Sequence, residues 1–141
     1  MRALVEAGAD LNQALTSGAT PLFIAAQNGK VEVLRALVGA GADLNRATTC
    51  GATPLFIAAQ NGEVEVVRAL AEAGADCKQA RTTDGATPLY IASQNGKAEV
   101  VRALVEAGAD PHQAAADGST PLAVAQTLGR EHPVWVFLST R

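Results

Sequence analysis

Apolar residues recur along the chain in short groups with helical spacing, separated by polar stretches that contain glycine. One such group, spaced i, i+1, i+4, i+5 as on one stripe of an α-helix, is Val33, Leu34, Leu37 and Val38. Another kind of apolar group begins at a Thr-Pro pair, as at Thr20 and Pro21. Threonine can cap the free N–H groups of a helix, and proline suits its first position. The pattern therefore predicts short helices of two kinds.

These helices come in pairs, each pair joined at a glycine. The predicted first helices span 21–28, 54–61 and 88–95, and the second helices span 31–40, 64–73 and 98–107. Gly29 follows the first helix of one pair and predicts a left-handed stop, and the second helix of that pair ends at Gly41. Polar, glycine-containing stretches such as 43–51 then lead to the next pair.

The pairs are copies of one another. Ala-Thr-Pro-Leu stands at 19–22, 52–55 and 86–89, with Ser-Thr-Pro-Leu at 119–122, so the intervals are 33, 34 and 33 residues. Ala-Gly-Ala-Asp stands at 7–10, 40–43, 73–76 and 107–110, which places one extra residue between Asp76 and Gly85. Residues 16–48 and 49–81 are identical at 24 of 33 aligned positions. One helix pair cannot bury its apolar face alone, so the copies are expected to stack into a continuous core.

One unit shows the whole motif: Gly51, Thr53-Pro54-Leu55, Ala58-Ala59, Gly62, Val66-Val67, Leu70 and Gly74-Ala75-Asp76. This motif resembles the ankyrin repeat, and nearly the whole chain follows it. The resemblance implies an all-α fold, a curved solenoid of stacked helix-turn-helix units with β-hairpin or β-turn fingers. It also implies that the protein binds a macromolecule on its concave face.

We expect one domain over residues 1–141. It begins with a partial repeat (1–15), continues with three full repeats (16–48, 49–81 and 82–114) and ends with a degenerate repeat (115–141). A closing helix is expected to start at Pro133.

Two departures from the family pattern stand out. The histidine that usually follows Thr-Pro-Leu is replaced by Phe23, Phe56, Tyr90 and Ala123, which predicts an apolar or aromatic column. The finger at 77–84 carries the extra residue. Its Lys78 and Arg81 predict a locally basic loop that could extend over a partner, and the alternative is a tolerated loop insertion.

Composition narrows the class of protein. The chain has 30 alanines and only five aromatic residues, so its core must be thin. Eleven basic and 14 acidic residues argue against a general nucleic-acid binder, and no apolar run of membrane-spanning length occurs. Two cysteines make no disulfide framework, which favours a reducing, cytoplasmic or nuclear location. Cys50 is expected to be an exposed thiol, whereas Cys77 replaces a leucine of other copies as a small apolar residue.

Candidate binding residues follow from the resemblance, which places the finger tips and the Gln-Asn ends of the first helices in the concave groove. The middle of the groove predicts a partner-binding set of Thr49, Cys50, Gln60, Asn61, Thr83, Asp84, Gln94 and Asn95. Their neutral amides offer both donors and acceptors to an extended peptide. The alternative is that these amides are solvated or bond to their own helix ends.

Catalysis finds little support. His112 and His132 lack metal-ligand spacing, and the glycines form no phosphate loop, so we expect no enzyme, no cofactor and no metal site. The sequence favours a non-catalytic protein-interaction module that binds a protein or peptide, with no nucleic-acid or membrane partner. The alternative is a structural or scaffold array, natural or consensus-engineered, without a dedicated partner.

The two ends of the array predict weak self-association, through Leu4 and Val5 or through Trp135 and Phe137. At the second of these ends, the alternative is that Trp135 and Phe137 simply cover the last repeat.

Overall fold

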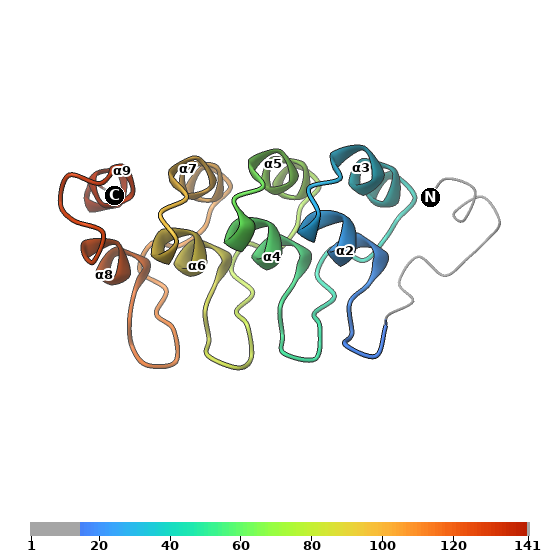
Figure 1. Cartoon of the computed structure of the whole chain (residues 1–141), viewed down its shortest axis with the longest axis horizontal. Helices are drawn as coiled ribbons and strands as arrows, with labels where there is room; N and C mark the ends of the chain where they lie inside the picture. The colour runs from blue at the N-terminus through green and yellow to red at the C-terminus, as the bar shows by residue number, and fades with distance from the viewer. Residues whose placement is uncertain (1–14, 141) are drawn as a thin grey trace.

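The computed structural model describes residues 15–140, and every helix in this part of the chain belongs to a repeating pair. The first helices are α2 (Pro21–Gln27), α4 (Pro54–Asn61), α6 (Pro88–Gln94) and α8 (Pro121–Gln126). The second helices are α3 (Val31–Gly39), α5 (Val64–Glu72), α7 (Ala98–Glu106) and α9 (Pro133–Ser139). Figure 1 shows the pairs side by side in chain order, with first helices in one layer and second helices in another. No strand is assigned within residues 15–140, so the described fold is an all-α repeat array, as predicted.

Each first helix begins where the Thr-Pro motif predicts. The Thr20 hydroxyl accepts a hydrogen bond from the Phe23 N–H at 3.2 Å, and Thr53 does the same for Phe56 at 3.1 Å. Both threonines are 1% exposed, so their hydroxyls satisfy helix N–H groups that water could not reach. The same motif therefore fixes the start of the first helix in every pair.

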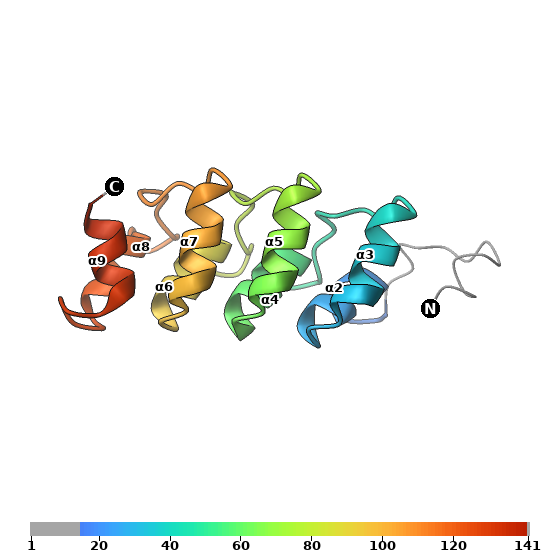
Figure 2. The ribbon, with the colours of Figure 1, turned by 90° about the horizontal axis from the view of Figure 1, so that it is seen from above.

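The two helix layers pack through small side chains. Within each layer neighbouring helices are in contact, first helices with first and second with second, as the view from above shows (Figure 2). Ala26, Ala59 and Ala92 on the first helices are all 0% exposed, as are Leu34 and Leu70 on the second. Alanine at the contact points lets the helices approach closely, which explains why a core with so few aromatic residues suffices.

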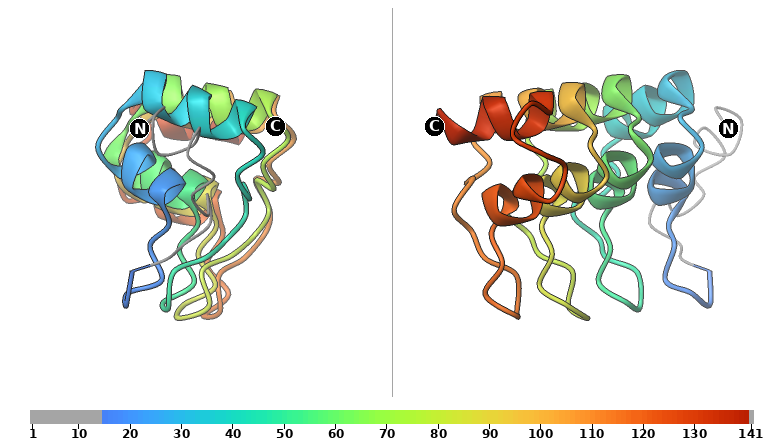
Figure 3. Two further views of the ribbon diagram at one scale, coloured as in Figure 1. Left: turned by 90° about the vertical axis from the view of Figure 1, so that its right-hand side faces the viewer. Right: turned by 60° about the vertical axis from the view of Figure 1, so that its left-hand side comes forward.

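Loops that end in tight turns, called fingers below, project from the array. Their tips are finger 1 (residues 15–19), finger 2 (48–52), finger 3 (81–86) and finger 4 (115–119). In finger 2 the Thr48 N–H donates to the Ala52 carbonyl at 2.9 Å, and the Gly51 N–H donates to the Thr48 carbonyl at 2.8 Å. Figure 3 shows all four fingers projecting from the same side of the helices.

The extra residue of the third repeat lies inside the turn itself. In finger 3 the Gly85 N–H donates to the Arg81 carbonyl, so the turn encloses 82–84, three residues instead of two. Elsewhere a backbone N–H joins neighbouring tips, as from Thr49 to the Ser17 carbonyl at 2.9 Å. Between fingers 2 and 3 the Thr82 hydroxyl makes this link instead, donating to the Cys50 carbonyl at 3.2 Å.

The last helix, α9, closes the described array at its C-terminal end. Val134 and Leu138 are buried, and the half-buried Trp135 and Phe137 pack against the same core. The helix starts at Pro133 as predicted, and its aromatic residues do cover the last repeats. Leu4 and Val5, the residues of the other predicted self-association surface, lie outside the described residues.

Candidate protein-interaction surface

The eight predicted binding residues lie on the finger tips and at the C-terminal ends of α4 and α6. Thr49 and Cys50 are at the tip of finger 2, and Thr83 and Asp84 at the tip of finger 3; all four are exposed. The row of tips can be followed in Figure 3. The remaining four residues are the Gln-Asn pairs at the ends of α4 and α6. They do not share one function, as their hydrogen bonds show.

The two asparagines join neighbouring repeats. The Asn61 side chain donates to the Gln27 backbone carbonyl at 3.2 Å, and Asn95 donates to the Gln60 carbonyl at the same distance. Both asparagines are exposed, and their N–H groups bond to the end of the preceding first helix rather than to their own helix end. Their donors already connect one repeat to the next, so the Gln-Asn motif recurs partly for a structural reason.

Three predicted residues, Thr83, Asp84 and Gln94, meet around one open hollow between fingers 3 and 4. This hollow, called the Tyr90 hollow below, has a volume of about 340 Å³. Its lining consists of Thr83, Asp84, Tyr90, Gln94, Ala115, Ala116 and Asp117. A hollow of this size lies at the lower end of the range of ligand sites, roughly 300–1,000 Å³.

Two carboxylates give the Tyr90 hollow its charge. The Ser119 N–H donates to the Asp117 carboxylate at 2.9 Å, and this hydrogen bond lowers the pKa of Asp117. Hydrogen bonds from Arg81 lower the pKa of Asp84 in the same way. Both groups are therefore negative at neutral pH. Within residues 15–140 no lysine or arginine forms an ion pair with Asp117.

Arg81 covers the neighbouring aromatic residue of the column. Its guanidinium lies 4.6 Å from the centre of the Phe56 ring and binds the Asp84 carboxylate through two hydrogen bonds, at 2.7 and 3.1 Å. Arg81 contributes less to the predicted basic character of finger 3 than Lys78 does, because its charge is paired with Asp84 within the finger. The hydrogen bond to Asp84 also raises the pKa of Arg81, so the pair stays ionised.

Finger 2 carries a thiol at the equivalent turn. Cys50 is exposed, as predicted, and its Sγ lies 3.2 Å from the Thr48 hydroxyl oxygen. This hydrogen bond is the largest cause of a lowered Cys50 pKa. Cys77 is half-buried against the core, which agrees with its predicted apolar role, and burial raises its pKa.

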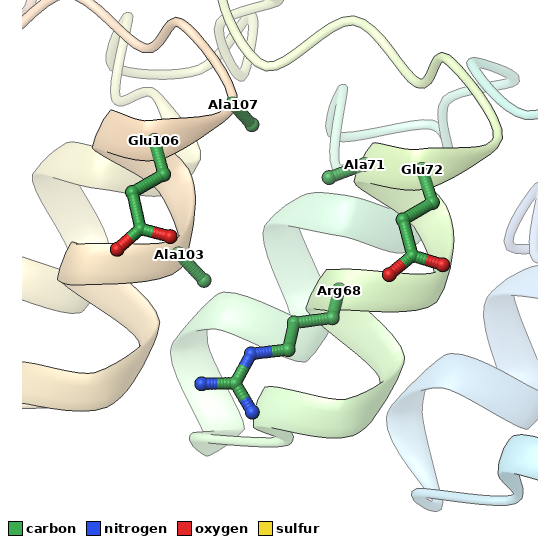
Figure 4. Close-up of a pocket in the computed structure, with 6 residues that line it drawn as sticks. All are labelled: Arg68, Ala71, Glu72, Ala103, Glu106 and Ala107. Carbon is green, nitrogen blue, oxygen red and sulfur yellow. The ribbon is translucent and has the colours of Figure 1, made fainter.

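The outer face, formed by the second helices, has a different character. An open hollow of about 400 Å³ lies between α5 and α7. Its lining consists of three alanines together with Arg68, Glu72 and Glu106, which are drawn in Figure 4. Arg68 pairs with Glu65 at 3.3 Å in its own helix and with Glu99 of the next repeat at 3.9 Å. Both signs of charge alternate here, so the face presents no field of one sign to a partner.

Sequence reasoning identified the aromatic column and the tips but missed how they combine. It did not foresee that Arg81 would fold onto Phe56, or that Tyr90 and Asp117 would share a hollow with the predicted residues. The available signal was the i, i+3 spacing of Arg81 and Asp84 in the finger that follows Phe56.

No helix within residues 15–140 is long and apolar enough to cross a membrane, and these residues bring together no group of three or more potential metal ligands.

Comparison with known proteins agrees with this architecture. A family model described as ankyrin repeats in three copies matches residues 1–81 and 74–140. No curated protein matches the chain. Ankyrin repeats generally serve as protein–protein interaction modules and are typically non-catalytic. The matched stretches span nearly the whole chain, which belongs to the ankyrin-repeat family.

Proposed function

We propose that this chain is a non-catalytic interaction module whose concave face, lined by the finger tips and first helices, binds a protein or an extended peptide. The contacts come from Thr49, Cys50, Gln60, Thr83, Asp84 and Gln94. Asn61 and Asn95 hold the surface together and contribute their remaining carbonyl oxygens. Two free thiols at Cys50 and Cys77 favour a reducing, intracellular location.

The strongest support for this proposal is the lining of the Tyr90 hollow. Here the tips of two fingers and a first helix surround one open volume, and three of the lining residues belong to the predicted set. The repeats are also cross-linked by side chains, as where Gln113 donates to the Lys78 carbonyl at 3.0 Å. A surface held in this way loses little freedom on binding, which favours affinity.

A peptide-array screen tests the proposal. Peptides that bind the wild-type chain are measured again with a triple variant, Gln60→Ala/Thr83→Ala/Gln94→Ala. We expect at least a tenfold loss of affinity. The matched control is Glu72→Ala/Glu106→Ala on the outer face, which is expected to bind as the wild type does.

Three outcomes would contradict the proposal. Peptides that bind equally well to the triple variant would place the site elsewhere. A loss of binding in the outer-face control alone would assign recognition to the second helices. Absence of any selective ligand would favour the scaffold alternative.

A further inference from the structure

The chain contains its own example of a side chain bound against the aromatic column. Where the full repeats 49–81 and 82–114 meet, the Arg81 guanidinium lies 4.6 Å from the Phe56 ring centre and donates two hydrogen bonds to Asp84. A guanidinium is attracted both to the face of an aromatic ring and to a carboxylate in bidentate geometry. Phe56 itself is only 1% exposed.

The next junction repeats two of these three groups. Tyr90 stands at the place of Phe56, because each is the N–H donor to the capping threonine of its first helix. Asp117 stands at the place of Asp84. Each carboxylate precedes the turn glycine and accepts from the N–H two residues later, at 2.9 and 3.1 Å respectively.

The third group is missing at that junction. Arg81 donates its N–H to the Ala86 carbonyl across the turn, and the residue that makes the same bond in finger 4 is Ala115. An alanine there has no side chain that could lie over Tyr90 or reach Asp117. The space becomes the Tyr90 hollow, and Tyr90 is only half-buried where Phe56 is covered.

The charges of the hollow fit a cation. Asp84 is already paired with Arg81 on one side, while Asp117 has no cationic partner within residues 15–140. Thr83 and Gln94 are neutral and can accept hydrogen bonds from a donor-rich group. The lining contains no basic residue that would repel such a group.

We propose that the Tyr90 hollow binds the guanidinium of an arginine side chain on the protein or peptide partner, with Tyr90 against its face and Asp117 beside it. This inference rests on the proposed function and identifies the partner by an exposed arginine. The partner's arginine takes the place that Arg81 takes one repeat earlier.

NMR titration with short capped peptides tests the inference. The three probes are Gly-Ser-Arg-Ser-Gly and the same peptide with lysine or with citrulline, a neutral isostere of arginine. We expect the arginine peptide to shift the amide signals of residues 83–94 and 115–119. Citrulline is expected to weaken binding at least tenfold, because the charge-assisted hydrogen bonds are lost. Lysine is expected to bind more weakly than arginine, because it cannot bind a carboxylate in bidentate geometry.

Matched variants separate the hollow from general attraction by charge. Asp117→Asn removes one negative charge from the hollow and is expected to abolish binding, whereas Glu106→Gln removes one from the outer face and is expected to have no effect. Ala115→Arg places a guanidinium at the hollow and is expected to block the peptide. Ala114→Arg adds the same charge at the exposed neighbouring position and should leave most of the binding intact.

Three results would overturn the inference: equal binding of citrulline or lysine, unchanged binding to Asp117→Asn or to Ala115→Arg, or signal shifts outside the hollow. Its failure is distinguishable from failure of the proposed function. A peptide that loses affinity for the Gln60/Thr83/Gln94 variant without needing an arginine would support concave-face binding and refute the arginine site alone.

Discussion

Replacing Arg81 with methionine tests the stacked arrangement over Phe56 directly. Methionine keeps an unbranched apolar stem against the ring but removes the guanidinium, and with it both the ring contact at 4.6 Å and the two hydrogen bonds to Asp84. The arginine side chain is 23% exposed, so its charge is partly shielded from water, whereas Asp84 is 48% exposed and keeps much of its hydration after the substitution.

The magnitude follows from these two contacts. A cation over an aromatic face contributes about 0.5–1 kcal/mol at a partly exposed site. A half-exposed ion pair with good geometry adds about 0.5–1 kcal/mol. The Arg81→Met variant should therefore lose about 1–2 kcal/mol of unfolding free energy. In a domain of this size that corresponds to a fall in Tm of roughly 3–6 °C.

Urea unfolding followed by circular dichroism at 222 nm measures the loss, and a double-mutant cycle with Phe56→Leu isolates the ring contact. We expect a coupling energy of about 0.5–1 kcal/mol between the two positions. Arg35→Met, on the outer face, removes the same charge and serves as the control, with an expected change below about 0.5 kcal/mol. A coupling below about 0.3 kcal/mol would show that the guanidinium is not held on the ring. The Arg81–Phe56 contact could then no longer serve as the model for an arginine bound in the Tyr90 hollow.

Three further predictions follow from other contacts. Because the folded-state pKa of Asp84 is lowered, its stabilising effect is present above the unfolded-state pKa and is lost as the pH falls through the lower folded value. The difference in Tm between wild type and Asp84→Asn should therefore shrink between pH 6 and pH 3, and a constant difference would contradict this. Gly51→Ala should destabilise more than Gly41→Ala in urea unfolding. Both have positive φ, but a Cβ at 51 would meet the Thr82 backbone nitrogen, whereas nothing lies within 4 Å at 41; equal losses would refute the clash. Trp135 and Phe137 pack onto the core, whereas Val136 between them is 48% exposed on α9, so weak self-association is expected through Val136 instead. The sedimentation mass should then rise with concentration, and Val136→Lys should remove the rise. A constant monomer mass would exclude this self-association.

The helices could be predicted from sequence because their signals are local and repeated. The Thr-Pro pair marks every first helix, and a glycine follows each predicted helix end. The predicted ends at Asn28 and Ala40 lie one residue beyond those in the structure, where these residues form the C-caps. Such small shifts occur because the residue that caps a helix is of the same kind as the residues of its last turn, so the sequence does not tell the two apart.

The candidate site was predicted only in part, because its properties depend on contacts between repeats. A single repeat does not reveal that Asn61 donates to a carbonyl 34 residues earlier. Nor does it reveal that Arg81, in finger 3, lies over the ring of Phe56 on the preceding first helix α4. Both contacts arise because the repeats stack, which brings side chains of one repeat close to the first helix of the repeat before it. The extra residue lies inside the turn of finger 3, so the turn hydrogen bonds, and not the 33-residue interval, make Ala115 the counterpart of Arg81.

The hydrogen bonds from Asn61 and Asn95 to the preceding first helices show that one part of each repeat joins it to its neighbour, while another part, the finger tip, is variable. Joints between repeats depend on helix ends that are identical in three copies, while the finger tips differ: Thr16-Ser17, Thr49-Cys50, Thr82 to Asp84, and Ala116-Asp117. Tip side chains are mostly exposed, and the links between neighbouring fingers use backbone groups except at the Thr82 hydroxyl. New recognition properties can therefore be introduced one finger at a time, with the spacing of all other contacts to the partner preserved.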